Sequence, residues 1–237
     1  MKIKYTLIAW LLPAMFMACS KDDDASPEPE GFLEGTNWVP ARVKKLDDHV
    51  YLDEKFNVVY VVDLRMGTVT SGDENPSFYW NFDSNSEIDT EKAKEGSETW
   101  HVLFNYIYFS TINADASTPN NTEGNGKVRI VRTAFDDLYE APESPMIRNN
   151  IPIEMDTEPA TTDGWGLYHF SKHIMDYYPD RTIIFHLRDG RYVKFQMLSL
   201  YQGNPPVVND KNEFPSPYLN CRYFIQQNAD SRNLKTK

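Results

Sequence analysis

The feature that most constrains the fold is a hairpin pattern late in the chain. Two runs of alternating apolar and polar residues, 181–187 and 192–198, lie on either side of Asp189 and Gly190. Alternation with a period of two places every second side chain on one face of a strand, and Asp-Gly is a strong signal for a tight turn. The pattern predicts an antiparallel hairpin with six apolar side chains on its core face. They are Ile183, Phe185, Leu187, Val193, Phe195 and Met197.

Several other segments carry the β-branched and aromatic residues that favour strands. They are residues 58–64, 100–111, 127–132 and 218–227. In the second of these, alternation would put Val102, Phe104, Tyr106 and Tyr108 on one face. Long polar loops are expected at residues 71–77, 83–98 and 113–126. No repeat and no long amphipathic helix is evident, so we predict an all-β fold, an antiparallel β-sandwich or open barrel with long loops.

The N-terminus has the pattern of an export signal. A short basic head precedes an apolar run, residues 5–17. The run is shorter than the roughly 20 residues that span a membrane and is typical of the apolar region of a signal peptide. It ends in Ala18-Cys19, which resembles the lipobox of bacterial lipoproteins. We expect a signal peptide at residues 1–18 and a lipid on Cys19; the alternative is an ordinary secretory signal cut elsewhere.

Residues 19–31 form the expected tether. A lysine and three aspartates, residues 21–24, follow the lipid site directly. They are similar to the surface-export signal of lipoproteins in Gram-negative anaerobes, and the simpler reading is a solvated linker that cannot fold. We expect a lipoprotein that is anchored in the outer membrane and faces outward, with a single β domain at residues 32–237.

Charge and cysteine content exclude several classes of partner. The chain has 35 acidic and 24 basic residues, a net charge of −11, which argues against binding nucleic acid or anionic lipid headgroups. With Cys19 lipidated, Cys221 has no disulfide partner, and its place in an alternating strand pattern predicts a buried, inert thiol. The sequence has no phosphate-binding loop, nucleophile elbow or CxxC motif, so we do not expect an enzyme.

One segment combines several side chains that could bind a metal. Residues 164–175 contain His169, His173 and Met175 among aromatic and apolar residues. A spacing of four puts the two histidines on one side of either a helix or a strand. Haem iron accepts axial His or Met, and its macrocycle needs apolar and aromatic walls. The alternative is that Met and the aromatic residues pack in the core while the histidines are solvated.

Across residues 58–227 the sequence resembles the HmuY family of haem-binding surface lipoproteins. Residues 100–104 are similar to the family's Trp-Asp-Ile-Ala-Phe strand, with His101 in place of the Asp. Gly164-Trp165 matches a Gly-Trp pair, and residues 187–197 resemble a hairpin with a Gly-Lys-Tyr-x-Lys-x-Gln-Ile pattern. Further similarities lie at residues 113–127, 135–142, 199–201 and 221–226.

The resemblance implies an all-β fold that holds haem in a loop-lined pocket by two axial ligands. The second ligand follows the Gly-Trp pair, so His169 is the closest match, with His173 and Met175 slightly further on. The first ligand comes from an upstream loop, where the candidates are Met146 and Met155. The implied pocket walls are Trp165, Tyr168 and Phe170.

Two functions follow as hypotheses. The first is a haemophore-like lipoprotein that captures haem outside the cell and passes it to a TonB-dependent outer-membrane receptor. The second is a lipoprotein of the same fold that has lost haem and binds glycan or protein through exposed aromatic side chains. His101 in place of the family's Asp, and a ligand loop that does not align cleanly, motivate the second hypothesis.

Overall fold

The computed structural model describes most of the chain after its first segment. The described residues are 38–67, 77–115, 126–144, 146, 148–157, 164–229 and 231–237. The chain divides into two compact units, Met1–Glu30 and Gly31–Lys237, and all described residues belong to the second. The expected signal peptide at residues 1–18, the tether at residues 19–31 and Cys19 lie outside the described residues.

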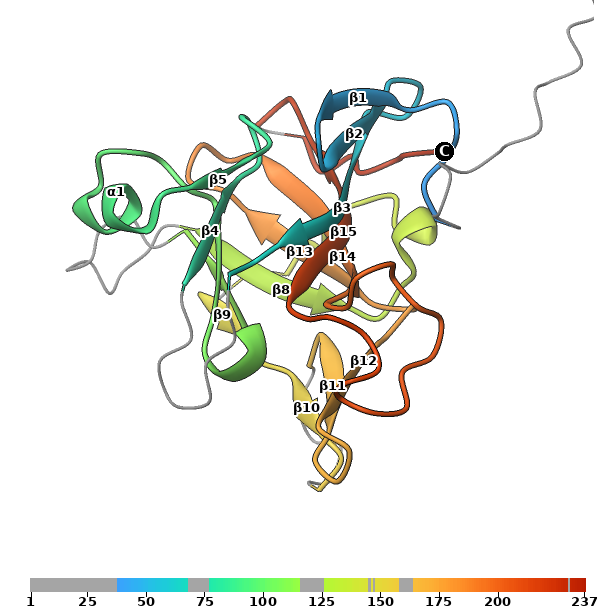
Figure 1. Ribbon diagram of the computed structural model, residues 1–237. Helices are drawn as coiled ribbons and strands as arrows, with labels where there is room; N and C mark the ends of the chain where they lie inside the picture. The colour runs from blue at the N-terminus through green and yellow to red at the C-terminus, as the bar shows by residue number, and fades with distance from the viewer. Residues whose placement is uncertain are drawn as a thin grey trace, which may run out of the picture. The chain divides into compact units, whose positions relative to one another are not determined.

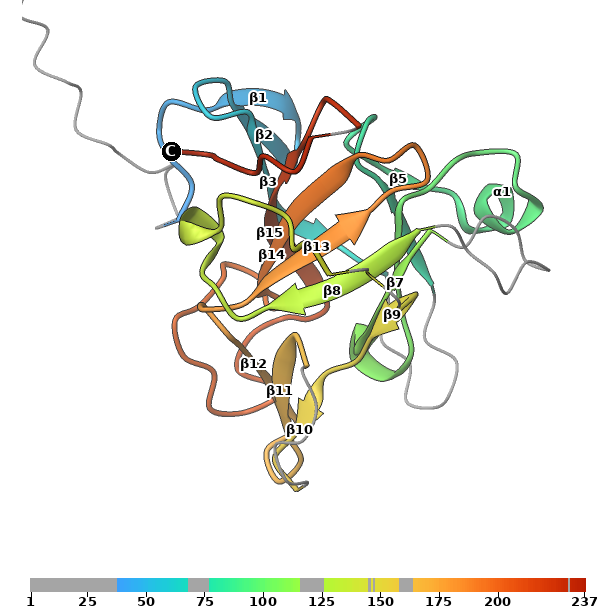
Figure 2. The same cartoon turned by 180° about the vertical axis from the view of Figure 1, so that it is seen from behind.

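The largest sheet has seven strands, which are labelled in Figures 1 and 2. They are β1 (Lys44–Asp47), β2 (Val50–Asp53), β3 (Val58–Arg65), β8 (Lys127–Val131), β13 (Thr182–His186), β14 (Tyr192–Ser199) and β15 (Tyr218–Ile225). Their order is β1-β2-β3-β15-β14-β13-β8, and every neighbouring pair is antiparallel. Because β1 and β8 are its two edges, this sheet does not close into a barrel within the part of the chain that the structure describes.

Two smaller sheets complete the domain. The strands of the five-stranded sheet are β4 (Phe78–Asn81), β5 (Ser86–Ile88), β6 (Val102–Asn105), β7 (Thr111–Ala114) and β9 (Asn150–Ile151). Their order is β5-β4-β6-β7-β9. The third sheet has β10 (Glu154–Met155) parallel to β11 (Gly166–His169), which is antiparallel to β12 (Ile174–Tyr177). It lies at the bottom of Figure 1, at the end of the domain away from β1 and β2.

Helix is scarce in the described residues. The three short helices are α1 (Thr90–Glu95) and the 3-10 turns η1 (Ile107–Phe109) and η2 (Phe135–Asp137). Within the described residues, none has the length and apolar character that a membrane crossing requires. The predicted all-β, antiparallel architecture is confirmed by this arrangement, with the single parallel pair β10–β11 as its exception.

The predicted hairpin is confirmed as β13 and β14. Its register pairs Ile183 with Phe195 and Phe185 with Val193, and all four side chains are buried. Gly190 occupies the turn with φ +86°, a conformation that is costly for residues with a Cβ. Local alternation and one glycine therefore determine this part of the fold.

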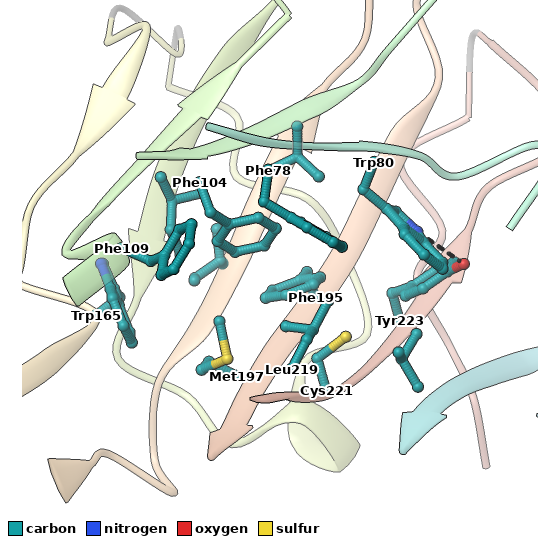
Figure 3. Packing of buried hydrophobic residues seen from close by; sticks show 14 of the residues in the cluster. Phe78, Trp80, Phe104, Phe109, Trp165, Phe195, Met197, Leu219, Cys221 and Tyr223 are labelled. Atoms are coloured by element: carbon teal, nitrogen blue, oxygen red, sulfur yellow. Dashed lines mark hydrogen bonds between the residues drawn. The ribbon is translucent and has the colours of Figure 1, made fainter. Parts of the chain in front are cut away.

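A largely aromatic core lies between the two larger sheets (Figure 3). Phe104 of β6 contacts Phe195 of β14 with ring centroids 6.2 Å apart, and Trp80 Nε1 donates a 3.2 Å hydrogen bond to the Tyr223 hydroxyl. Burial of each large apolar side chain stabilises the fold by about 1.5–3 kcal/mol. Cys221 belongs to this core, where burial raises the pKa of its thiol, so the predicted buried, unpaired cysteine is confirmed.

The expected strand over residues 100–111 is wrong in its second half. β6 ends at Asn105, and Tyr106, Tyr108 and Phe109 have φ values of 67°, 54° and 55°. A strand cannot include such left-handed residues, so η1 replaces it and Tyr106 and Tyr108 leave the buried face of β6. Phe109 is fully buried in the main core, and this tertiary contact overrides the local preference for a strand.

The expected loop at residues 83–98 also contains regular structure, namely β5 and α1. Asp89 caps α1, since its side chain accepts hydrogen bonds from the backbone N–H groups of Glu91 (3.0 Å) and Lys92 (3.1 Å). Gly96 ends the helix in the left-handed conformation. An Asp cap followed seven residues later by Gly is a helix signal that the polar composition obscured. Most of the other two expected loops, residues 71–77 and 113–126, lies outside the described residues.

Candidate functional site

The third sheet positions the segment that contains the candidate ligands. In the β11–β12 hairpin, Tyr168 pairs with Met175 and His169 pairs with Ile174. Paired residues of an antiparallel sheet project from the same face, and successive residues alternate between faces. Tyr168 and Met175 therefore project from one face of the hairpin, and His169 projects from the other.

The two histidines do not share one side, so that expectation is wrong. The chain reverses between them in a tight turn, in which the His173 backbone N–H donates a 2.8 Å hydrogen bond to the His169 carbonyl. His173 closes this turn with φ +55° and contacts Tyr168, whose side chain projects away from His169. A spacing of four places two residues on one side only within one continuous helix or strand, and here a turn separates the two histidines.

Glu154 connects β10 to the beginning of β11. Its buried carboxylate accepts hydrogen bonds from the Gly164 N–H (3.0 Å), the Tyr178 hydroxyl (2.7 Å) and Arg181 Nη1 (2.8 Å). Burial by itself would raise the pKa of Glu154, but these donors outweigh burial and hold that pKa below its usual range. The carboxylate is therefore ionised at neutral pH and fixes the place where the candidate segment enters the sheet.

A cavity of about 270 Å³ opens on the Tyr168 face of the hairpin. Four separate parts of the chain line it: η1 through Tyr108, the β11–β12 hairpin through Tyr168, His173 and Met175, the segment directly after β14 through Tyr201, and the loop that leads into β15. We call it the tyrosine cavity. The rings of Tyr108 and Tyr168 are stacked, with centroids 6.0 Å apart, so aromatic surface forms one continuous wall.

His173 lines this cavity, and one of its two ring nitrogens is hydrogen-bonded. Its Nδ1 is 2.7 Å from the Tyr168 hydroxyl, and no hydrogen bond to its Nε2 is found among the described residues. Metal-binding histidines commonly have one ring nitrogen hydrogen-bonded, which fixes the tautomer and the ring orientation. The arrangement therefore presents Nε2 of His173 to a ligand.

His169 is engaged at both ring nitrogens. Its Nε2 is 2.7 Å from Asp176 Oδ2, and its Nδ1 is 3.4 Å from Asp156 Oδ2. Asp156 also accepts a 3.0 Å hydrogen bond from the Phe170 N–H. His169 thus links the end of β10 to β12, on the face away from the tyrosine cavity. Its role as a haem ligand stays a prediction, and it would require one carboxylate contact to break.

The three candidate methionines lie in different environments. Met175 is buried, lines the tyrosine cavity and donates its backbone N–H to the Tyr201 hydroxyl (2.9 Å). Met155 is in register with Tyr168 in the neighbouring strand and is 42% exposed. Met146 packs in a separate apolar cluster with Leu138, which follows η2, and Ile184 of β13. The structure therefore brings Met175 together with His173, places Met155 beside that group, and places Met146 in another cluster.

The three residues that the resemblance implies as pocket walls also lie in different environments. Tyr168 lines the cavity. Trp165 is buried in the main core, where its Nε1 donates to the Ser110 carbonyl (3.0 Å) and its ring stacks on Tyr177. Phe170 is 55% exposed, and its ring centroid is 5.8 Å from that of His173. Trp165 is thus a core residue in this structure, and Phe170 is exposed beside Tyr168 and His173, two residues that line the cavity.

Backbone strain is concentrated around this cavity. Eight described residues other than glycine have positive φ, and four of them are Tyr106, Tyr108, Phe109 and His173. Each such residue costs on the order of 1–3 kcal/mol and persists only where its surroundings enforce it. Such outliers often mark functional sites, and here they set the positions of Tyr108 and His173.

Two of the cavity tyrosines, Tyr168 and Tyr201, have a raised pKa and are neutral at physiological pH. Burial raises the pKa of Tyr168, and the nearby Tyr108 and Asp156 raise it further. Burial likewise raises the pKa of Tyr201. Tyr168 and Tyr201 therefore present uncharged phenol rings and hydroxyl groups to a ligand.

Sequence reasoning missed two of the three tyrosines. Tyr108 had been assigned to a continuous strand, and Tyr201 is far away in the sequence from the His-Met segment. No local motif marks either residue, because folding brings η1 and the end of β14 to the third sheet. The hairpin residues Tyr168, His173 and Met175, which the sequence offers as candidates, all line this cavity, and their roles stay predictions.

The chain matches no family model and no curated protein. Among solved structures, a protein of Bacteroides vulgatus ATCC 8482, provisionally described as HmuY-like and heme-binding, is 11% identical with a TM-score of 0.41, and the match covers 77% of this chain and 95% of that one. A provisionally described lipoprotein of Bacteroides fragilis NCTC 9343 is 10% identical with a TM-score of 0.37, covering 77% and 92%. Because these identities and TM-scores are low, the fold is described here from the strand pairings of this chain alone.

Proposed function

We propose that this chain is a surface lipoprotein that binds haem at the tyrosine cavity, with Nε2 of His173 as an iron ligand. One observation carries the proposal. The Tyr168 hydroxyl fixes Nδ1 of His173 at 2.7 Å, and Nε2 remains available beside stacked aromatic rings. Haem iron accepts imidazole nitrogen, and the porphyrin packs well against aromatic and apolar walls.

The donor set of the cavity fits haem. Besides His173, the cavity contains Met175, and haem iron accepts the thioether sulfur of Met as well as imidazole. The volume of about 270 Å³ lies just below the usual 300–1,000 Å³ of ligand pockets. A haem would therefore be enclosed only in part, with the exposed ring of Phe170 close by, next to His173. Haem would serve as cargo, and the chain would bind and orient it.

Location and delivery form the second part of the proposal. The lipobox-like Ala18-Cys19 and the acidic run that follows it support a lipid anchor in the outer membrane with the domain facing outward. A haem carrier at that position would pass its cargo to a TonB-dependent receptor. Replacing Cys19 by Ser should release the protein from the membrane fraction, as detected by fractionation and labelling with radioactive palmitate. Unchanged fractionation together with unchanged labelling would contradict the anchor.

Absorbance titration with haemin tests the binding site. The segment from residue 31 onward contains the whole second unit and should give a sharpened Soret band with haemin. His173→Ala should lose this band, whereas His49→Ala, a change in an exposed histidine between β1 and β2, should keep it. His169→Gln separates the two candidate ligands. If His169→Gln loses the band and His173→Ala keeps it, the assignment to His173 is wrong.

A glycan is the second candidate ligand. The cavity is lined by the exposed ring of Tyr108 and by polar side chains such as Asn212, and the exposed ring of Phe170 lies next to the lining residue His173. Such a combination can stack against a sugar while bonding its hydroxyl groups. A glycan array with the same protein tests this candidate. Binding that is lost in Phe170→Ala, combined with a haemin spectrum equal to that of free haemin, would favour glycan over haem.

A further inference from the structure

The tyrosine cavity has a second wall with a different chemical character. The loop of residues 202–217, between β14 and β15, contributes Lys211, Asn212 and Ser216 to its lining. These are a cation and two neutral hydrogen-bonding groups. They face a cavity whose remaining polar side chains are phenols and one histidine. The ligand therefore meets aromatic surface on one side and hydrogen-bond donors on the other.

The loop that carries Lys211 is well fixed at its base. The Gln202 N–H donates to the Pro215 carbonyl (2.9 Å), and the Gly203 N–H donates to Asp63 Oδ1 of β3 (2.8 Å). Phe214 packs against the main core. These contacts give Lys211 a defined place at the cavity, although its side chain is exposed.

Lys211 makes no ion pair among the described residues. The carboxylates next to it bond to the loop backbone instead. Asp210 Oδ1 accepts from the Asn212 N–H (2.9 Å), and Glu213 Oε2 accepts from the Asn209 N–H (2.6 Å). In a chain with a net charge of −11, an unpaired ammonium group at a cavity is available to an anion from outside.

We infer that Lys211, together with Asn212 and Ser216, forms a subsite for the anionic group of the cavity's ligand. The ligand class is then a flat aromatic molecule that carries a carboxylate at its edge. Haem is a molecule of this class, so the inference rests on the proposed function. The haem iron would be bound at His173, and the haem carboxylates would lie toward Lys211. A charge-assisted hydrogen bond at an exposed site corresponds to roughly a three- to tenfold change in affinity.

Three probes separate this subsite from iron binding: haemin, haemin dimethyl ester, and metal-free protoporphyrin IX. Lys211→Gln should weaken binding of haemin and protoporphyrin about three- to tenfold and leave the ester unaffected. The matched control is Lys172→Gln, in the exposed turn between β11 and β12, which does not line the cavity. Haemin affinity should also fall with added salt in the natural protein, and less so in Lys211→Gln.

The outcomes distinguish the anionic subsite at Lys211 from iron binding by His173. His173→Ala should abolish the haemin spectrum but leave protoporphyrin binding, measured by fluorescence quenching, nearly unchanged. If Lys211→Gln binds haemin and protoporphyrin as tightly as the natural protein does, the anionic subsite is refuted whatever His173→Ala does. If Lys211→Gln weakens both probes while His173→Ala keeps its Soret band, the subsite stands and iron ligation by His173 fails. If neither probe binds the natural protein, both claims fail.

Discussion

A buried lysine in β14 gives a sharp test of the fold. Lys194 is fully buried, and its Nζ donates to the carbonyls of Phe135 (2.9 Å) and Leu138 (3.2 Å) and to the Thr236 hydroxyl (2.7 Å). Burial lowers its pKa to about 7; Asp136 opposes this change. The C-terminal segment thus packs over an ionisable group that titrates near neutral pH.

The sign and size of the pH dependence follow from this lowered pKa. The unfolded chain keeps the proton of Lys194 up to its ordinary pKa of 10.5, whereas the folded chain loses it near pH 7. Since the unfolded state binds more protons between these values, the free energy of unfolding rises with pH. Between pH 7 and pH 9 the rise is about 2 kcal/mol from Lys194 alone. Below pH 7 this contribution is constant, and it is complete above pH 10.5.

Urea unfolding followed by tryptophan fluorescence at pH 7, 8 and 9 measures this dependence. In Lys194→Met the rise of about 2 kcal/mol should disappear, even though the loss of three hydrogen bonds lowers stability at every pH. Lys235→Met, at an exposed position of the same C-terminal segment, is the matched control and should keep the rise. An equal rise in Lys194→Met and in the natural protein would refute the reasoning.

Three further substitutions test packing and turn geometry. Phe135→Ala should cost about 3–5 kcal/mol in urea unfolding, because its fully buried ring also contacts Lys194 Nζ and the Arg222 guanidinium, each 4.3 Å from the ring centroid; a cost below about 1 kcal/mol would contradict this packing. Glu154→Ala breaks a buried ion pair and should cost about 3–5 kcal/mol, and an unchanged melting temperature would exclude the role assigned to that carboxylate. Gly190→Ala should cost about 1–2 kcal/mol because of its positive φ; unaltered stability would indicate another turn conformation.

The sequence predicted those parts of the fold that local patterns determine. The β13–β14 hairpin follows from alternation and from Gly190, and the buried Cys221 follows from alternation in β15. By contrast, the end of β6 at Asn105 is set by the burial of Phe109 in a core that forms from distant strands. A pattern within ten residues contains no information about that core.

The candidate site likewise combines residues that a local pattern identifies with an arrangement that only the folded chain produces. His173 and Met175 could be identified as metal-binding residue types, but their arrangement depends on a turn over residues 170–173 that has no Gly, Pro or Asn to signal it. His173 itself takes the left-handed position that Gly or Asn usually takes. Lys211 reaches the cavity only because β14 and β15 pair and return their connecting loop to the third sheet.

The position of the iron in a haemin complex is the most direct test of the central claim. A crystal of the second unit soaked or grown with haemin, measured at the iron absorption edge, locates the iron by its anomalous signal. We predict iron in the tyrosine cavity, bonded to Nε2 of His173, with Nδ1–H of His173 still donating its hydrogen bond to the Tyr168 hydroxyl. Iron bonded to His169 on the opposite face of the hairpin, or haem bound elsewhere on the domain, would contradict it.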